Sequence, residues 1–555
     1  MGLQNYEGKL PSEKSSKNNI IGIVVLSPIL IMMISFLFVP FISTFYKSFT
    51  NYNWLHVQSI KFTGLENYLT ILLKDSVFKI TVKNTFIIVF FSTTISVGIS
   101  YLLAYGSSKT HKVYRYILSV LFLIGSLTFI IPAGLKPFFA HSKFSYIHLL
   151  FASQQQPINY ISNPLFVRSL SLILPILLGL GPLYLLFTLA FMKGNNIKKT
   201  LRMGITLQIV LTFLSYNSVG TIVSNPSVNY MADTINTYAL RNLTIRYEVG
   251  YASALLIINS LILAFYVIVG NVLVNLLMSN QSKNYEGKSF NVLWSLIIFI
   301  VLFIISLVLL YPFIQIIIDS FKPIDELFKY PQELLVNDPT LKNYKMTINR
   351  TGSSNYNFSH NLFKTFLVIA QSSIIMMILM GISSIGAYFL NPRTKRIILL
   401  LMTLSFVLTP IVLPLFHINL NVGTFNSVID LIVKSWPFGV SMLLGITLFD
   451  GLMRRHNNLN KFFSSTKDLM YFFLGILSIS QLASIYIWIN PFHGFPLGSN
   501  KSNLFQLLNY QYHGMAEYGT YASLYVLSMI IPITIVSLYT PLLIFSYTRP
   551  QINKE

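Results

Sequence analysis

Long apolar stretches separated by shorter polar ones dominate this sequence. A helix that crosses a bilayer needs about 20 consecutive apolar residues, and runs of that length recur along the chain between polar residues, glycine or proline. Twelve such runs lie near residues 20–43, 84–105, 116–135, 171–192, 205–224, 250–278, 291–318, 365–390, 397–416, 436–453, 469–489 and 519–546. They predict an all-α polytopic membrane protein with about 12 transmembrane helices.

The two halves of this pattern repeat each other in the same orientation. The matched pairs, at offsets between about 269 and 283, are Pro40 with Pro312, Ser48-Phe49 with Ser320-Phe321, Asn67-Tyr68 with Asn343-Tyr344, Gly98 with Gly381, and Gly250 with Gly519. The predicted parts are a leader at 1–19, a six-helix repeat at 20–278, a polar linker at 279–290, a second six-helix repeat at 291–546 and a tail at 547–555.

Two parallel six-helix repeats predict a pseudo-two-fold axis along the membrane normal. A translocation path would then run between the halves. A membrane scaffold with a duplicated fold and no pathway is the alternative, because a fold does not by itself imply a function.

Lysine and arginine set the expected orientation. With the N-terminus inside, the cytoplasmic segments hold 21 of the 39 basic residues in about 80 positions. Short basic loops on one side and long, sparsely charged loops on the other follow the positive-inside rule. We therefore expect a multi-pass membrane protein with both termini in the cytoplasm.

The composition agrees with membrane lipid as the main surroundings. The chain is 54% hydrophobic and 10% charged, with a net charge of +22. So few charges cannot cover the surface of a soluble protein of this length, and 14% aromatic residues exclude a disordered chain. The basic excess lies between apolar runs, so positive-inside topology explains it and no nucleic-acid partner is expected.

Candidate chemistry for catalysis is sparse. The sequence has no cysteine, its nine histidines show no metal-ligand spacing, and it contains no phosphate-binding loop. These features exclude thiol catalysis and disfavour a metal site, and the chain itself has no ATPase motif. We expect no enzyme activity and no cofactor in this chain.

The repeated residues resemble a known family. Ser48-Phe49-Thr50 followed by Gly64-Leu65-Glu66-Asn67-Tyr68 looks like the start of the first permease of carbohydrate ABC importers, of the maltose and glycerol-phosphate type. The second half resembles the partner permease, through Ser320-Phe321-Lys322-Pro323, Pro339-Thr340-Leu341-Lys342-Asn343-Tyr344 and Trp436-Pro437-Phe438-Gly439. The chain is thus similar to two permeases fused into one.

The resemblance implies the type I ABC importer permease fold in each half. The implied function is the import of a carbohydrate or related solute across the bacterial plasma membrane. It also implies two cytoplasmic ATPase subunits that bind ATP-Mg, and an extracellular solute-binding lipoprotein. In the family the fifth helix helps to line the sugar path, so the candidate path residues are Tyr216, Asn217, Gln481, Ser484, Tyr486 and Trp488. The alternative is that these polar side chains tie helices together, as such residues do in membranes.

The ATPase-coupling loops depart from the family pattern. Family permeases carry a Glu-Ala-Ala signature in a cytoplasmic loop that docks into the ATPase, and neither corresponding loop has it. The candidate docking residues are the basic residues of these loops: Lys193, Lys198, Lys199, Arg202, Arg454 and Arg455. The alternative is that these residues only set the topology, as basic residues of cytoplasmic loops commonly do. Either a divergent ATPase docks on these short loops, or the fold has lost ATP coupling and serves as a scaffold or receptor for an extracellular assembly.

Overall fold

A computed structural model describes most of the chain. The described residues are 16–129, 163–193, 197–215, 232–277, 291–329, 333–349, 357–404, 439–453, 459–489, 508 and 517–548. The predicted linker at 279–290 and most of the predicted leader and tail lie outside them. All regular secondary structure in the described residues is helical, apart from one isolated bridge between Thr50 and Phe62.

Seven of the described helices are long and apolar enough to cross a membrane. They are α4 (Ser76–Ser108), α8 (Pro164–Lys193), α13 (Val249–Leu277), α14 (Val292–Ser320), α17 (Phe358–Phe389), α22 (Thr466–Ile489) and α24 (Tyr518–Thr548). The prediction of an all-α membrane protein with several spans is confirmed at this level.

The other five predicted runs overlap helices that are shorter, interrupted or less apolar. These are the first helix in its three parts, α1 (Ser16–Met33), the π-helical turn η1 (Ile34–Phe38) and α2 (Val39–Lys47), then α5 (Lys112–Thr128), α9 (Ile197–Ser215), a helical stretch at 392–404 and α20 (Gly439–Met453). Pro40 near the start of α2 has no backbone N–H, and a π turn before such a residue is a common place for a helix to bend.

Helix ends extend beyond the apolar runs where polar residues occupy the first turns. α4 begins at Ser76, eight residues before the predicted span, because Lys79 and Lys83 interrupt the apolar pattern but not the helix. The side chain of Asp75 caps this helix by accepting hydrogen bonds from the backbone N–H groups of Val77 and Phe78, which satisfies two donors that the first turn leaves unpaired.

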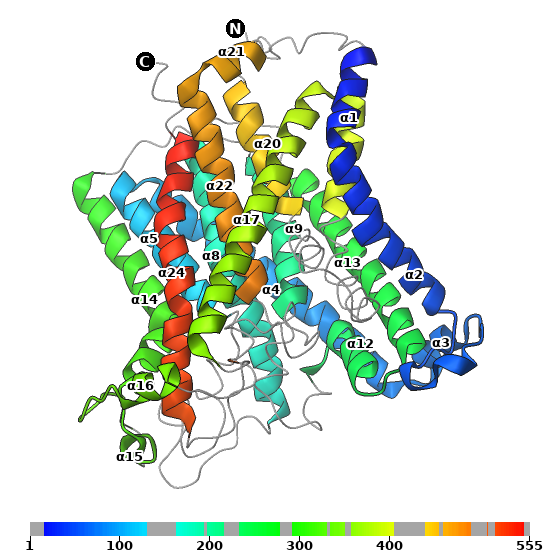
Figure 1. Ribbon diagram of the computed structural model, residues 1–555, viewed down its shortest axis with the longest axis horizontal. Coiled ribbons are helices and arrows are strands. Elements are labelled where there is room, and N and C mark those ends of the chain that lie inside the picture. Colours follow the sequence, from blue (N-terminus) through cyan, green and yellow to red (C-terminus); the bar gives the residue numbers. More distant parts are fainter. Residues whose placement is uncertain are drawn as a thin grey trace.

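The molecule has two ends that carry different short helices. The start of α1, the end of α24 and α21 (Leu459–Ser464) lie toward one end, which we call the terminal face (Figure 1). The opposite end, the distal face, carries α3 (Glu66–Leu69), α12 (Ile235–Thr244), α15 (Ile324–Leu327) and α16 (Lys342–Ile348).

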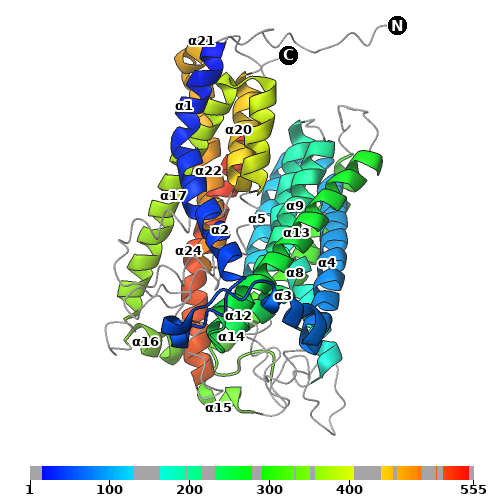
Figure 2. The ribbon, with the colours of Figure 1, turned by 90° about the vertical axis from the view of Figure 1, so that its right-hand side faces the viewer.

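The two halves exchange their first helices. α1 packs against α17 of the second half, while α14, the first helix of the second half, packs against α5 of the first half. Figure 2 shows α1 on the side of α17, α20 and α22, apart from the group of α4, α8 and α9. After its π turn the first helix returns to its own half, because α2 packs on α13.

An equivalent hydrogen bond joins each exchanged first helix to the other half. The side-chain carbonyl of Asn19 accepts a hydrogen bond from the backbone N–H of Asn391 at 3.1 Å, and the hydroxyl of Ser295 accepts one from the N–H of His111 at 3.0 Å. His111 and Asn391 each precede a helix that follows the long second helix of their half. A polar side chain on each first helix therefore satisfies a backbone donor of the other half.

Candidate functional site between the two halves

The turn after the first helix is bonded to the short helix that follows it. The hydroxyls of Ser48 and Tyr68 are 2.7 Å apart, and the Asn67 amide donates to the carbonyls of Ser48 and Thr50 at 2.9 and 2.8 Å. The ring of Phe49 lies 5.5 Å from that of Tyr68. The Ser-Phe and Asn-Tyr pairs thus form one local unit.

The second half contains the same unit. The hydroxyls of Ser320 and Tyr344 are 2.7 Å apart, and the Asn343 amide donates to the carbonyls of Ser320 and Lys322 at 3.0 and 2.9 Å. The Phe321 and Tyr344 rings are 5.2 Å apart. Residues that the sequence pairs by offset therefore make equivalent hydrogen bonds and ring contacts.

Burial affects the two tyrosines in the same way. It raises the pKa of both Tyr68 and Tyr344 above the usual value, and the hydrogen bond to the neighbouring serine opposes this only in part. Both hydroxyls therefore stay protonated at physiological pH, so each can donate to its serine.

A glycine at the start of the last helix of each half fits against this unit. A Cβ at Gly250 would overlap the carbonyl oxygen of Thr50, and one at Gly519 would lie within 3 Å of the Asn343 side chain. The Gly250 N–H also donates to the carbonyl of Tyr52 at 2.9 Å. The repeated glycines thus allow the last helix to approach the repeated turn.

We expect Gly250→Ala to destabilise the protein by about 1–3 kcal/mol, because the added methyl group must displace backbone atoms. Gly98→Ala is the matched control: a Cβ there meets nothing within 4 Å, and alanine favours a helix by about 1 kcal/mol over glycine. Thermal unfolding of the two variants in detergent checks this. Equal midpoints would show that the close approach at Gly250 is unimportant.

Buried hydroxyl groups tie the second helix of each half to the fifth. Ser92 of α4 and Thr212 of α9 are 3.0 Å apart, and so are Ser373 of α17 and Ser480 of α22. All four side chains are buried. Hydrogen bonds of this kind hold helices together inside a membrane.

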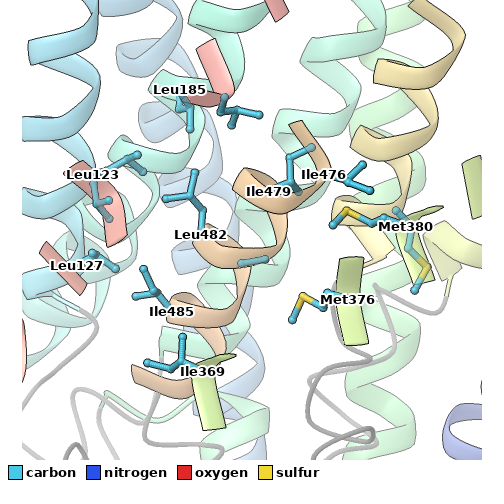
Figure 3. Close-up of a cluster of buried hydrophobic side chains, with 14 of the residues drawn as sticks. Leu123, Leu127, Leu185, Ile369, Met376, Met380, Ile476, Ile479, Leu482 and Ile485 are labelled. Atoms are coloured by element: carbon cyan, nitrogen blue, oxygen red, sulfur yellow. The ribbon is translucent and has the colours of Figure 1, made fainter. Parts of the chain in front are cut away.

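An apolar layer fills the contact between the halves. The hydrophobic core of the second half includes Leu123 and Leu127 of α5 and Leu185 of α8. Figure 3 shows Leu482 and Ile485 of α22 pointing toward these leucines of the first half. A polar solute that passes between the halves at this level would have to separate these side chains, because they offer it no hydrogen-bond partner.

The predicted path residues fall in different surroundings. Ser484 is buried, and its hydroxyl donates to the Ser480 carbonyl at 2.7 Å and lies 3.5 Å from the Ser372 hydroxyl of α17. These contacts are with its own helix and with α17. Gln481 is half-buried on the same helix. Tyr486 and Trp488 continue α22, but their side chains lie outside the description, as do Tyr216 and Asn217 entirely.

A polar residue that we did not predict lies in the middle of α13. Asn259 is fully buried, and neither polar atom of its side chain has a hydrogen-bond partner among the described residues. An amide without a partner in an apolar interior costs several kcal/mol. The sequence signal was present, since Asn259 interrupts the apolar run Ala254-Leu255-Leu256-Ile257-Ile258.

A buried ion pair at the distal face was also missed. Lys322 Nζ lies 2.8 Å from Asp319 Oδ1, and both side chains are shielded from solvent. The Tyr518 hydroxyl donates to Asp319 Oδ2 at 2.9 Å, which joins α14 to the first residue of α24. The sequence had placed Asp319 only at a helix end.

The predicted docking residues of the first half lie on both sides of residues 194–196, which connect α8 to α9. Lys193 ends α8, and Lys198, Lys199 and Arg202 lie in the first two turns of α9. Lys199 is exposed, whereas Lys198 and Arg202 are half-buried. Only residues 194–196 separate the two helices, so this loop has no room for a further helix.

The corresponding loop of the second half contains α21. Arg454 and Arg455 lie outside the described residues, and α21 follows them. Its Phe462 is fully buried, with ring centroids 5.3 Å from Phe449 of α20 and 6.2 Å from Phe472 of α22. This aromatic contact fixes α21 to both neighbouring helices.

An ion pair strengthens the same face. Lys395, in the first turn of the helical stretch at 392–404, lies 3.0 Å from a carboxylate oxygen of Asp450 near the end of α20. Both side chains remain partly exposed, so the pair contributes at most about 1 kcal/mol.

The described part of the chain contains no group of three His, Asp or Glu side chains that could hold a metal ion. The arrangement offers helix packing, an apolar contact between α22 and helices α5 and α8, and a fixed short helix on the terminal face. No protein-family model matches the chain, and no curated protein matches it.

Proposed function

We propose that the chain is the transmembrane subunit of an ABC-type importer that moves a carbohydrate or related small solute across the bacterial plasma membrane. Separate ATPase subunits that bind ATP-Mg would drive it from the terminal face, which would be cytoplasmic. An extracellular solute-binding lipoprotein would deliver the solute to the distal face. In this proposal the chain has twelve spans in two fused permease repeats.

The repeated Ser-Phe and Asn-Tyr unit is the observation that carries the proposal. Equivalent hydrogen bonds at Ser48 and Ser320, together with the exchanged helices α1 and α14, support a duplicated unit with two-fold pseudosymmetry. In such duplicated transporters the solute site lies at the contact between the repeats. The apolar layer of α5, α8 and α22 lies at that contact, and would be the closed gate of the path.

The terminal face supports a coupling role for α21. Coupling requires an element that moves as a unit with the spans, and Phe462 fixes α21 to α20 and α22. The first half has no described counterpart of α21 between α8 and α9. The two ATPase contacts would therefore be unequal.

A scaffold or receptor without ATP coupling is the second candidate. The short loops favour it, because α21 has only six residues, or less than two turns of helix. Such a protein would still bind an extracellular partner at its distal face, but it would not move solute in response to ATP.

Purification of the tagged full chain from its native membrane in mild detergent separates the two candidates. The importer proposal predicts that an ATPase co-purifies and that its activity changes when the chain is reconstituted in lipid. If no ATPase co-purifies and none is stimulated, the importer proposal fails. Capture of an extracellular protein alone would then support the scaffold.

We expect Asn259→Leu to change stability and uptake in opposite directions. The replacement removes a buried amide without a partner, so stability should rise by about 1–3 kcal/mol. If Asn259 meets the solute or its water on the path, uptake by cells should fall.

The matched control is Asn271→Leu on the same helix, since the Asn271 amide already donates to the Val267 carbonyl at 2.7 Å. This control should not gain stability. Uptake by Asn259→Leu cells at the wild-type rate would place the amide away from the path.

A further inference from the structure

The connection between the first helix and α4 forms a helical segment with two apolar sides. α3 continues directly into the π-helical turn η3 (Thr70–Lys74), so the segment runs from Glu66 to Lys74. One side carries Tyr68 and the fully buried Ile71 and packs on the protein. The other side exposes three leucines, and Leu65 immediately before the segment is a fourth. All four have 52–71% of their surface exposed: Leu65, Leu69, Leu72 and Leu73.

Both ends of this segment are held close to spans. Tyr68 and Asn67 bond to Ser48, one residue after α2 ends, and α4 begins two residues after Lys74. The segment therefore cannot extend away from the level at which these helices end. Tyrosine and tryptophan side chains, which favour membrane interfaces, pack at this level: Tyr52, Trp54, Tyr68, Tyr238 and Tyr251.

The segment also lies at the edge of the molecule. Figure 1 places α3 at the periphery, beyond the ends of α2 and α13, and α3 packs on α13. α2 itself exposes Ile42 and Phe45, so exposed apolar surface continues from the span to the segment. Exposed apolar surface at the rim of a membrane protein contacts lipid. A protein partner that docks over the proposed path would instead cover the centre of the distal face.

The charges around the leucines fit the same surroundings. Lys61 and Lys74 are exposed on either side of the segment, where they can reach lipid phosphates while the leucines enter the acyl chains. The second half has this pattern only in part. By the offset that pairs Asn67 with Asn343, the exposed Leu341 and Ile348 correspond to Leu65 and Leu72, but Lys345 and Asn349 replace Leu69 and Leu73. Four exposed leucines are thus particular to the first half.

We propose that Glu66–Lys74 is an interfacial helix, and that its three exposed leucines and the preceding Leu65 insert into the lipid leaflet at the distal face. Its partner is the lipid surface itself, and the segment anchors the outer end of the first span in the membrane plane. This inference rests on the chain being a membrane protein and is independent of the importer proposal.

Spin labels can test this directly, because the chain contains no cysteine. Leu72→Cys and Leu73→Cys are each labelled with a nitroxide in nanodiscs of phosphatidylethanolamine and phosphatidylglycerol. Collisions with oxygen, which concentrates in lipid, should exceed collisions with a water-soluble nickel complex. The nickel collision rate should be about tenfold below that at Lys74→Cys, the aqueous control on the same segment.

Leu102→Cys in α4, 67% exposed, provides the lipid reference. Nickel accessibility at Leu72 and Leu73 equal to that at Lys74 would overturn the proposal, because the leucines would then face water. Shielding from both oxygen and nickel would overturn it too, since a protein surface would then cover them. Gel filtration of each labelled variant confirms that the fold is retained.

Discussion

Asp319→Ala should destabilise the protein by about 3–5 kcal/mol, because it leaves the Lys322 ammonium buried without its counter-charge. Lys322 and Asp319 are 1% and 0% exposed, so water cannot solvate the remaining charge. The variant also removes the acceptor of the Tyr518 hydroxyl and so loosens the joint between α14 and α24. Unfolding in mixed detergent micelles gives the change in free energy.

Two control variants separate the loss of this ion pair from the loss of a carboxylate in general. Asp325→Ala removes an exposed carboxylate a few residues away and should change stability by less than about 0.5 kcal/mol. The double variant Asp319→Asn with Lys322→Met removes both charges and should recover most of the lost stability. A double variant as unstable as Asp319→Ala would show that the ion pair itself is not the cause.

The apolar pattern was sufficient to predict the membrane class and the long helices. The run near 291–318 became α14 almost residue for residue, because no charged residue interrupts it before Asp319. The matched Ser-Phe and Asn-Tyr pairs indicated a structural repeat as well as a sequence repeat. Ser48 and Ser320 make equivalent hydrogen bonds. Short polar motifs at a fixed distance from a span report local bonding.

The exchange of first helices could not be predicted from the same pattern. Elements that follow each other in sequence usually pack together, so α1 would be expected beside α4 and α5. Instead α1 packs on α17, and the residue that marks this contact, Asn19, is an ordinary polar residue near the start of a span. Hydropathy identifies which helices face lipid or protein, but it does not identify the partner helix.

The candidate site was predictable only in part for a similar reason. Periodicity placed Ser484 in a span but could not say that its hydroxyl lies next to α17. It also gave Asp319 a position near a helix end without the partner that buries it, because Lys322 lies beyond the apolar run. Interactions between a helix end and the turn that follows it depend on the fold of that turn.

Phe462 and Phe463 are neighbours on α21, and replacing each with alanine should affect a different property. Phe462→Ala should lower stability, whereas Phe463→Ala should affect only the capture of an ATPase. Phe462 is buried between α20 and α22, and its removal should cost about 3–5 kcal/mol of stability. Phe463 is 47% exposed on the terminal face, so its removal should leave stability within about 0.5 kcal/mol. If α21 docks an ATPase, Phe463→Ala should instead weaken capture of that ATPase by about tenfold or more, as loss of an aromatic contact residue does.

The comparison tests the coupling role of α21 because each neighbour controls for the other. Stability comes from thermal unfolding of the purified chain, and capture from titration of the ATPase against the chain in nanodiscs. Phe463→Ala that captures the ATPase as tightly as the wild type would remove α21 from the contact, whatever happens to Phe462→Ala. Weak capture with unchanged stability would instead mean that six residues of helix, held by one buried ring, suffice as the docking element of this half.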